Sequence, residues 1–229
     1  GSGYIGSTLV ENLLKKKFKI INYDIQWYGK NLLKNKNLKN IKDDLKNISK
    51  YKLKNIDTVV HLANIANDVS SEIDPEFSWK TNVLYLRLIL ENCKKFGVKK
   101  FIYLSSGSVY GVKKEKKVTE KLSLKPISTY NQTKMIAENV LNSYKKNFKI
   151  FIIRPATVCG PSKRIRLDIS VNQLVYQAVK NKKITIHGGQ QIRPNIHIRD
   201  LVNAIIFFLE KNVTTGTYNL GFENLKIID

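Results

Sequence analysis

The sequence has few cysteines, histidines and acidic residues, and it has no long apolar run. Its two cysteines, Cys93 and Cys159, exclude a disulfide framework and a four-cysteine zinc site. Its three histidines share no metal-ligand spacing, so we assign no metal. No apolar run reaches the roughly 18 residues of a membrane-spanning helix, and no signal segment opens the chain. We therefore expect a protein of the reducing cytoplasm that has no membrane partner.

The shortage of acidic residues leaves a net charge of +22, because 40 lysines and arginines face 18 aspartates and glutamates. A charge of this size is compatible with a nucleic-acid or membrane surface. Most of it comes from lysines in short runs such as 15–17 and 182–183, and lysine, asparagine and isoleucine share A+T-rich codons. No aromatic residues alternate with the basic ones as a base-stacking platform would require. We predict no nucleic-acid partner, and an RNA-binding or regulatory module is the alternative to an enzyme.

Apolar runs of strand length alternate with amphipathic stretches of helix length. Strands are predicted at 19–24, 57–63, 100–105 and 149–154, with helices at 5–16, 78–96 and 130–146. This alternation predicts an α/β fold with a doubly wound parallel sheet. After residue 154 we expect helices at 169–181 and 200–211, and short strands around 184–186, 195–198 and 217–220. We assign residues 1–155 to a cofactor-binding domain and 156–229 to a smaller, mixed α/β substrate-binding part.

A glycine turn opens the chain. Gly3 and Gly6 stand at the start of the first predicted helix, where glycines let a backbone approach a pyrophosphate. Asp24 ends the next strand, 21 residues after Gly3, close to the spacing of about 20 for an acid that binds a ribose hydroxyl. Its carboxylate would repel a 2′-phosphate, which favours NAD over NADP. Because such a turn normally follows a strand, we expect a chain truncated at both ends that lacks the first, central strand.

Two further segments end short apolar runs. Asp43 and Asp44 follow the run 38–41, where a carboxylate can accept a hydrogen bond from an adenine amino group; a solvated turn is the alternative. The segment 61–64 ends a predicted buried strand, at the sheet edge where such folds bind ligands. His61 itself is more typical of a packed histidine than of a catalyst.

The strongest chemical signal combines a serine-rich strand end, residues 104–111, with Tyr130 and Lys134. A spacing of four places the phenol and the amine on one helix face. An ammonium group together with a cationic nicotinamide in a dry site can lower the phenol pKa from about 10 towards neutrality. The phenolate can then remove a proton from a sugar hydroxyl, which a serine at the strand end positions.

These motifs together resemble the extended short-chain dehydrogenases/reductases, or NAD-dependent epimerase/dehydratase family, whose members act on nucleotide-diphosphate sugars. The resemblance covers almost the whole chain and implies a Rossmann-type fold, NAD as cofactor and a homodimer. It implies Ser106, Tyr130 and Lys134 as catalytic residues. Tyr130 and Lys134 are also implied in cofactor binding, with Gly3, Tyr4, Ile5, Gly6, Asp24, Asp44, Leu45, Leu62, Ala63, Asn64, Asn82 and Pro155. The implied substrate-binding residues are Ser106, Ser108, Tyr130, Thr157, Asn172 and Arg193.

Two positions indicate which reaction of the family to expect. Its 4,6-dehydratases carry an acidic pair directly after the catalytic Ser/Thr, where this chain has Gly107 and Ser108. Neither residue can act as the acid that expels a hydroxyl as water. We therefore expect NAD-dependent epimerisation of a nucleotide-diphosphate sugar at C4, through a 4-keto intermediate. A net 4-dehydrogenase, ketoreductase or dehydratase is the alternative.

Overall fold

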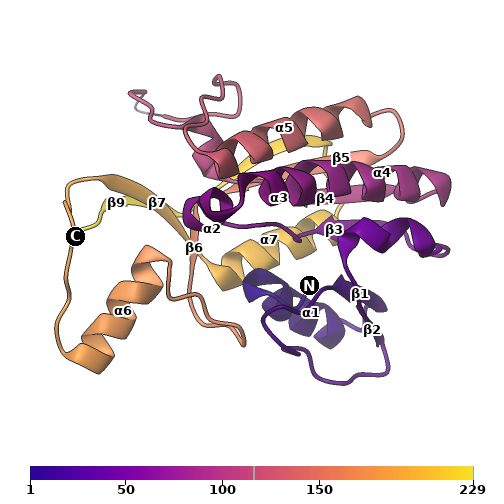
Figure 1. Ribbon diagram of the computed structural model, residues 1–229, viewed down its shortest axis with the longest axis horizontal. Coiled ribbons are helices and arrows are strands. Elements are labelled where there is room, and N and C mark those ends of the chain that lie inside the picture. The colour runs from indigo at the N-terminus through magenta and orange to yellow at the C-terminus, as the bar shows by residue number, and fades with distance from the viewer. Residues whose placement is uncertain (116, 229) are drawn as a thin grey trace.

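The centre of the structure is a four-stranded parallel sheet (Figure 1). This computed structural model describes residues 1–115 and 117–228. The strands of the sheet lie in the order β3 (Thr58–His61), β4 (Lys100–Leu104), β5 (Lys149–Pro155) and β8 (Gly216–Leu220). All three strand pairs are parallel, so the carboxyl ends of the strands meet at one edge of the sheet.

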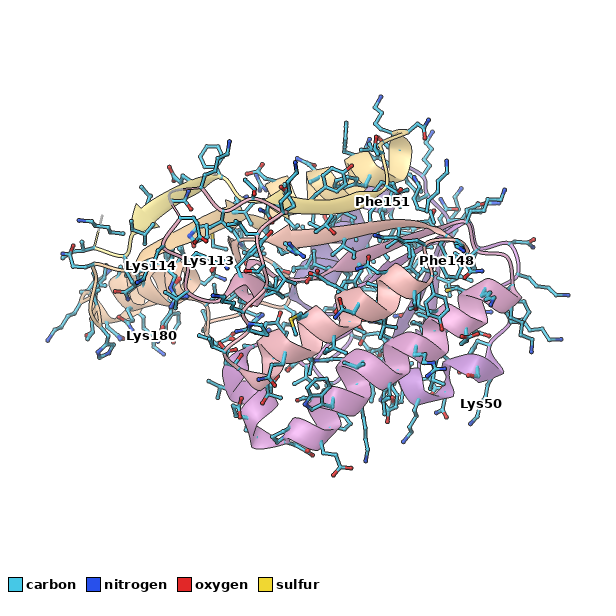
Figure 2. All side chains as sticks on the ribbon, turned by 90° about the horizontal axis from the view of Figure 1, so that it is seen from above. Lys50, Lys113, Lys114, Phe148, Phe151 and Lys180 are labelled. Carbon is cyan, nitrogen blue, oxygen red and sulfur yellow. The ribbon has the colours of Figure 1, made fainter. Side chains whose placement is uncertain are left out.

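Helices cover both faces of this sheet (Figure 1). One face carries α1 (Tyr4–Lys15) and α7 (Ile198–Glu210), and the other carries α4 (Tyr85–Lys95) and α5 (Thr129–Ser143). Alternate residues of β4 enter the two cores, with Phe101 and Tyr103 on the α4–α5 side and Ile102 on the α1–α7 side. Figure 2 labels Phe148, which stacks on Tyr144, and Phe151, which packs against Phe208 of α7. Burial on both faces explains the nearly continuous apolar strands and confirms the predicted α/β fold class.

Two smaller sheets flank the central one. The parallel pair consists of β1 (Ile20–Asp24) and β2 (Leu38–Lys42). In the mixed sheet, β7 (Ile192–His197) lies between β6 (Thr157–Cys159) and β9 (Glu223–Lys226), and α6 (Ser170–Asn181) follows β6 in the chain. The short helical elements are η1 (Leu45–Lys50), α2 (Asp68–Ile73), α3 (Pro75–Trp79), η2 (Lys80–Leu84) and η3 (Gly107–Tyr110). No helix in the described ranges is long and apolar enough to cross a membrane.

Most predicted elements form close to their predicted bounds, but one prediction is wrong. Residues 184–186 form no strand; they are exposed, and β7 pairs instead with β6 and β9. The helix expected over 78–96 forms, and the π-helical turn η2 within it joins α3 to α4. The sequence pattern does not predict α2 or β6, which are too short to show a period. The end of the chain, residues 225–229, suggests the start of a further element; β9 forms over Glu223–Lys226, and residue 229 lies outside the described residues.

Candidate active site

The glycine turn and Asp24 meet at the start of α1. The Asp24 carboxylate accepts hydrogen bonds from the backbone nitrogens of Gly1 at 2.7 Å, Ser2 at 2.8 Å and Gln26 at 2.7 Å. The structure therefore brings together the two halves of the predicted dinucleotide signature.

The two predicted glycines differ in what surrounds them. A Cβ on Gly6 would lie 2.5 Å from the carbonyl oxygen of Gly1, so packing inside the protein requires this glycine. A Cβ on Gly3 would meet no protein atom within 4 Å. Gly3 is the N-cap of α1 and has no side chain to bind the first N–H groups of the helix. Tyr4 is buried and Ile5 is half-buried, so the open space lies beside the backbone at Gly3. This geometry fits an anion such as a pyrophosphate.

A second group of predicted cofactor residues gathers where β3 ends. Asn82 of η2 binds the backbone of Ile65 through both amide atoms and donates to Thr133 Oγ1 at 3.0 Å. It therefore fixes the segment after Leu62 and Ala63, both half-buried. Among residues 1–115 and 117–228, the buried side-chain amide of Asn64 finds no hydrogen-bond partner. An unpaired buried amide costs stability, so this group fits a polar ligand at the same edge.

Asp44 and Leu45 lie further along this edge. The Asp44 carboxylate caps η1 by accepting from Lys46 N at 3.1 Å, and Leu45 begins that helix. The capping bond agrees with the turn interpretation of this segment and leaves the second carboxylate oxygen for the weak ion pair with Lys46 at 3.8 Å.

The amino end of α5 presents Tyr130 and Lys134 to the end of β4. Ser128 caps the helix by accepting from Asn131 N, and its own hydroxyl donates to Asp68 at 2.5 Å. Lys134 Nζ donates to the Leu104 carbonyl oxygen at 2.6 Å and lies 5.9 Å from the centre of the Tyr130 ring. Tyr130 is half-buried and Lys134 is buried. The predicted pair therefore shares one helix face at the carboxyl edge of the sheet.

The electrostatics of this pair differ from the sequence-based expectation. Burial raises the pKa of Tyr130 to about 12, against a hydrogen bond with Ser106 and the charge of Arg166, which both act to lower it. Burial also lowers the pKa of Lys134 to about 7. With the chain's own groups alone, the phenol is thus moved away from neutrality, because desolvation exceeds the effect of nearby cations.

Ser106 and Ser108 lie together directly after β4. Their hydroxyl oxygens are 2.7 Å apart, and Ser108 Oγ also donates to Asn131 Oδ1 of α5. Gly107 lies close to the carbonyl oxygen of Pro155, where an added Cβ would come within 3.2 Å. The strand end is therefore pressed between α5 and the end of β5, which keeps the Ser106 hydroxyl beside Tyr130.

The residues predicted to bind the sugar nucleotide are not all gathered at this point. Asn172 is buried and uses its amide to bind Gly160 N, the Tyr4 hydroxyl and Arg166 O, so it holds the loop after β6 against α1. Thr157 is half-buried in β6, next to Asn195 of β7. Arg193 is exposed on β7, opposite Leu225 of β9, and none of its guanidinium nitrogens is hydrogen-bonded within the described ranges.

Residues outside the predicted set also surround Tyr130. Arg166 binds Asp168 through Nε at 3.1 Å and Nη2 at 2.5 Å, and Asn67 Nδ2 donates to the same carboxylate at 2.8 Å. The charge of Arg166 acts on the pKa of Tyr130. Nothing in the sequence links Asn67 to Asp168, 101 residues apart. Glu138 of α5, which also lies outside the predicted set, had a readable signal, since Tyr130, Lys134 and Glu138 repeat every four residues.

Comparison with known proteins identifies relatives of this chain. The model of the NAD dependent epimerase/dehydratase family matches residues 1–221. The chain is 36% identical to an uncharacterized UDP-glucose epimerase of Bacillus subtilis, over 96% of this chain and 74% of that protein. It is 34% identical to the dTDP-D-glucose 4,6-dehydratase of Dictyostelium discoideum, over 96% of this chain and 56% of the relative.

Solved structures of nucleotide-sugar-binding proteins are also similar to this chain. The UDP-glucuronic acid 4-epimerase from Bacillus cereus, in complex with UDP-glucuronic acid and NAD, superimposes with a TM-score of 0.87 and 32% identity, over 100% of this chain and 78% of that one. MoeE5 in complex with UDP-glucuronic acid and NAD gives a TM-score of 0.88 and 27% identity, over 99% of this chain and 76% of that one.

Proposed function

Since this chain belongs to the NAD-dependent epimerase/dehydratase family, we propose that it epimerises a nucleotide-diphosphate sugar at C4 through a 4-keto intermediate. The observation that carries the proposal is the junction of β4 and α5, where Ser106, Tyr130 and Lys134 meet. NAD is the cofactor of the family, and when bound it supplies a hydride acceptor and a positively charged ring. The open space at Gly3 and the unpaired amide of Asn64 support its placement along the carboxyl edge of the sheet.

Each catalytic side chain has one task in this proposal. The Tyr130 phenol oxygen takes the proton of the sugar hydroxyl that is oxidised, and returns it when the ketone is reduced. The Ser106 hydroxyl, which acts to lower the pKa of Tyr130, donates a hydrogen bond to the same sugar oxygen. The Lys134 side chain is held near the phenol, because its Nζ donates a hydrogen bond to the Leu104 carbonyl oxygen. Ser108 and Asn131 orient Ser106 through their shared hydrogen bonds.

The strand end favours epimerisation over elimination of water. Gly107 and Ser108 follow Ser106, and neither side chain is an acid; Ser108 Oγ is occupied by Asn131 and Ser106. A dehydratase needs a proton donor for the departing hydroxyl, so this position supports an epimerase. A net 4-dehydrogenase or ketoreductase uses the same Ser106, Tyr130 and Lys134, and a dehydratase stays an alternative outcome of the test.

The remaining parts of the proposal concern the whole protein. We propose that residues 1–155 hold NAD and that 156–229 contribute to binding the sugar nucleotide, including Thr157, Asn172 and Arg193. The unpaired guanidinium of Arg193 supports its assignment to the diphosphate. We also propose a homodimer that works in the cytoplasm without a nucleic-acid partner, which sedimentation and cell fractionation can test.

The decisive experiment offers the protein a panel of UDP-glucose, UDP-glucuronic acid, UDP-N-acetylglucosamine and dTDP-glucose with NAD, and identifies products by NMR. We expect the C4 epimer of one sugar with no net formation of NADH. Stoichiometric NADH would instead indicate a dehydrogenase, and a 4-keto-6-deoxy sugar would indicate a dehydratase. If no sugar reacts while RNA binds tightly at physiological salt, a binding module replaces the enzyme.

A further inference from the structure

A buried ion pair lies directly behind the proposed catalytic lysine. Glu138 of α5 and Arg154 of β5 are 3% and 6% exposed. Arg154 donates from Nε to one carboxylate oxygen at 3.0 Å and from Nη2 to the other at 2.6 Å. Burial of two charges costs several kcal/mol of desolvation per ion, so such a pair is weak evidence for added stability. Its position is therefore more informative than its energy.

The pair is part of a chain of contacts that ends at Tyr130. Tyr130, Lys134 and Glu138 stand at every fourth residue of α5 and so share one face of the helix. Ser105 Oγ donates to the Glu138 carboxylate at 2.5 Å, and the next residue in the chain is Ser106. Lys134 Nζ binds the carbonyl oxygen of Leu104 at 2.6 Å. Glu138 therefore links α5, the helix on which it and Tyr130 lie, to the strand end that carries Ser106.

We propose that Glu138 is a positioning residue that keeps Lys134 in its ammonium form beside Tyr130, and that Arg154 limits how strongly it does so. The inference rests on the proposed function, because it gives the pair a role in the same acid–base step. Burial works against the charge of Lys134, and the negative charge of Glu138 is the opposing influence. The Arg154 cation neutralises part of that charge, so the two partners act on Lys134 with opposite sign.

The other groups that face this cluster are few. The ring centre of Tyr103 of β4 lies 4.7 Å from Lys134 Nζ. The positive charge of Lys134 also acts to lower the pKa of His61 of β3. Burial lowers the pKa of His61 to about 3, so it is neutral near pH 7. Arg154 Nη1 binds the Tyr110 hydroxyl at 2.6 Å, and that hydroxyl donates to Asn219 at 2.7 Å. Within the described residues, Glu138 is thus the carboxylate that acts on Lys134 in this cluster.

The test follows the titration of Lys134 directly by NMR in protein labelled at lysine Cε, with Lys134→Met to assign the signal. Lys134 titrates near pH 7, apart from ordinary lysines near about 10.4. We expect Glu138→Gln to lower the midpoint by about 1 pH unit and Arg154→Gln to raise it by a similar amount. The double variant should return close to the wild-type value. Glu91→Gln removes a carboxylate of α4 that binds Tyr144, and serves as the control without a shift.

A merely structural role of the pair would not shift the Lys134 midpoint in opposite directions in Glu138→Gln and Arg154→Gln. An unchanged Lys134 midpoint in folded Glu138→Gln, or shifts of the same sign, would overturn the inference. If Glu138→Gln does not fold, Arg154→Gln and Ser105→Ala provide the test, since an upward shift in Arg154→Gln is required. The titration needs no substrate, so it separates failure of this inference from failure of the proposed function. In the active protein, the pH profile of turnover should move in the same direction as the Lys134 midpoint.

Discussion

Tyr130 is the residue on which the proposed chemistry depends. Replacing it with phenylalanine removes the proton acceptor and keeps the ring against α5. General acid–base catalysis by one side chain is typically worth about 10²–10⁴-fold, so we expect turnover to fall by that factor or more. NAD retained on gel filtration should not change. Ser106→Ala should cost less, because the serine hydroxyl positions the sugar oxygen while the phenol moves the proton. Turnover near the wild-type rate in Tyr130→Phe would refute the mechanism.

His61 shows that a histidine at the carboxyl edge of a strand can belong to the core. It is 3% exposed and stacks with Phe101 and with Tyr103, and its Nε2 has no hydrogen-bond partner in the part of the chain that the structure describes. Desolvation by burial, and next the positive charge of Lys134, lowers its pKa to about 3. The structure thus agrees with the prediction of a packed histidine.

This buried imidazole should make the protein sensitive to acid. Between pH 6.5 and about pH 3 the unfolded chain binds a proton that the folded chain does not. The free energy of unfolding should therefore fall as the pH falls through that window, by up to about 1.4 kcal/mol per pH unit from this group. His61→Gln should flatten the slope in urea unfolding measured from pH 4 to 7. Carboxylates contribute equally to both proteins, so equal slopes would contradict the prediction.

At the scale of single elements, α5 depends on its first turn. The Ser128 hydroxyl accepts from Asn131 N and donates to Asp68 of α2, so one side chain caps the helix and ties it to a neighbour. Thr129 N, the next backbone donor, binds Glu72 of α2 at 3.2 Å. The helix that carries Tyr130 and Lys134 is therefore anchored at the end nearest the proposed chemistry.

Ser128→Ala should destabilise the protein by about 1 kcal/mol, the usual effect of losing an N-cap. We also expect kcat to fall, because the loosened turn carries Tyr130. Ser143→Ala is the matched control, since that exposed hydroxyl lies at the other end of α5 and bonds only to Val140 O within the described residues. Thermal unfolding and turnover of both variants test this, and equal effects at the two ends would contradict it.

The elements also show which parts of the fold and site the sequence could predict. Strands buried on both faces and amphipathic helices have a clear period, so β3, β4, β5, α1 and α5 were predictable. The meeting of Ser106 with Tyr130 and Lys134 follows from a strand end and a helical spacing. The wrong strand at 184–186 had the right residues and no neighbour with which to pair. Asn172 binding the Tyr4 hydroxyl joins residues 168 apart, which no local pattern encodes.

At the scale of the whole molecule, the charge is the dominant feature. The 18 acidic residues cannot neutralise 40 lysines and arginines. Among the lysines labelled in Figure 2, Lys50 lies at the opposite end of the molecule from Lys113, Lys114 and Lys180. Ion pairs such as those of Lys15 with Glu11 and Lys16 with Glu210 lie at the surface, where each contributes little. Repulsion among dispersed cations therefore opposes the compact state.

This repulsion predicts that salt stabilises the protein. The Debye length falls from about 30 Å at 0.01 M to about 8 Å at 0.15 M, so added sodium chloride screens distant lysines from one another. We expect the urea midpoint to rise over this range, whereas a protein held by surface ion pairs would lose stability. Urea serves as denaturant because guanidinium is itself a salt. Sodium sulfate at equal ionic strength separates screening from binding of a particular anion: equal effects indicate screening, and a larger, saturable effect of sulfate indicates a specific site. A midpoint that falls with sodium chloride would show that the lysines are held in attractive pairs, contrary to the dispersed charge inferred here.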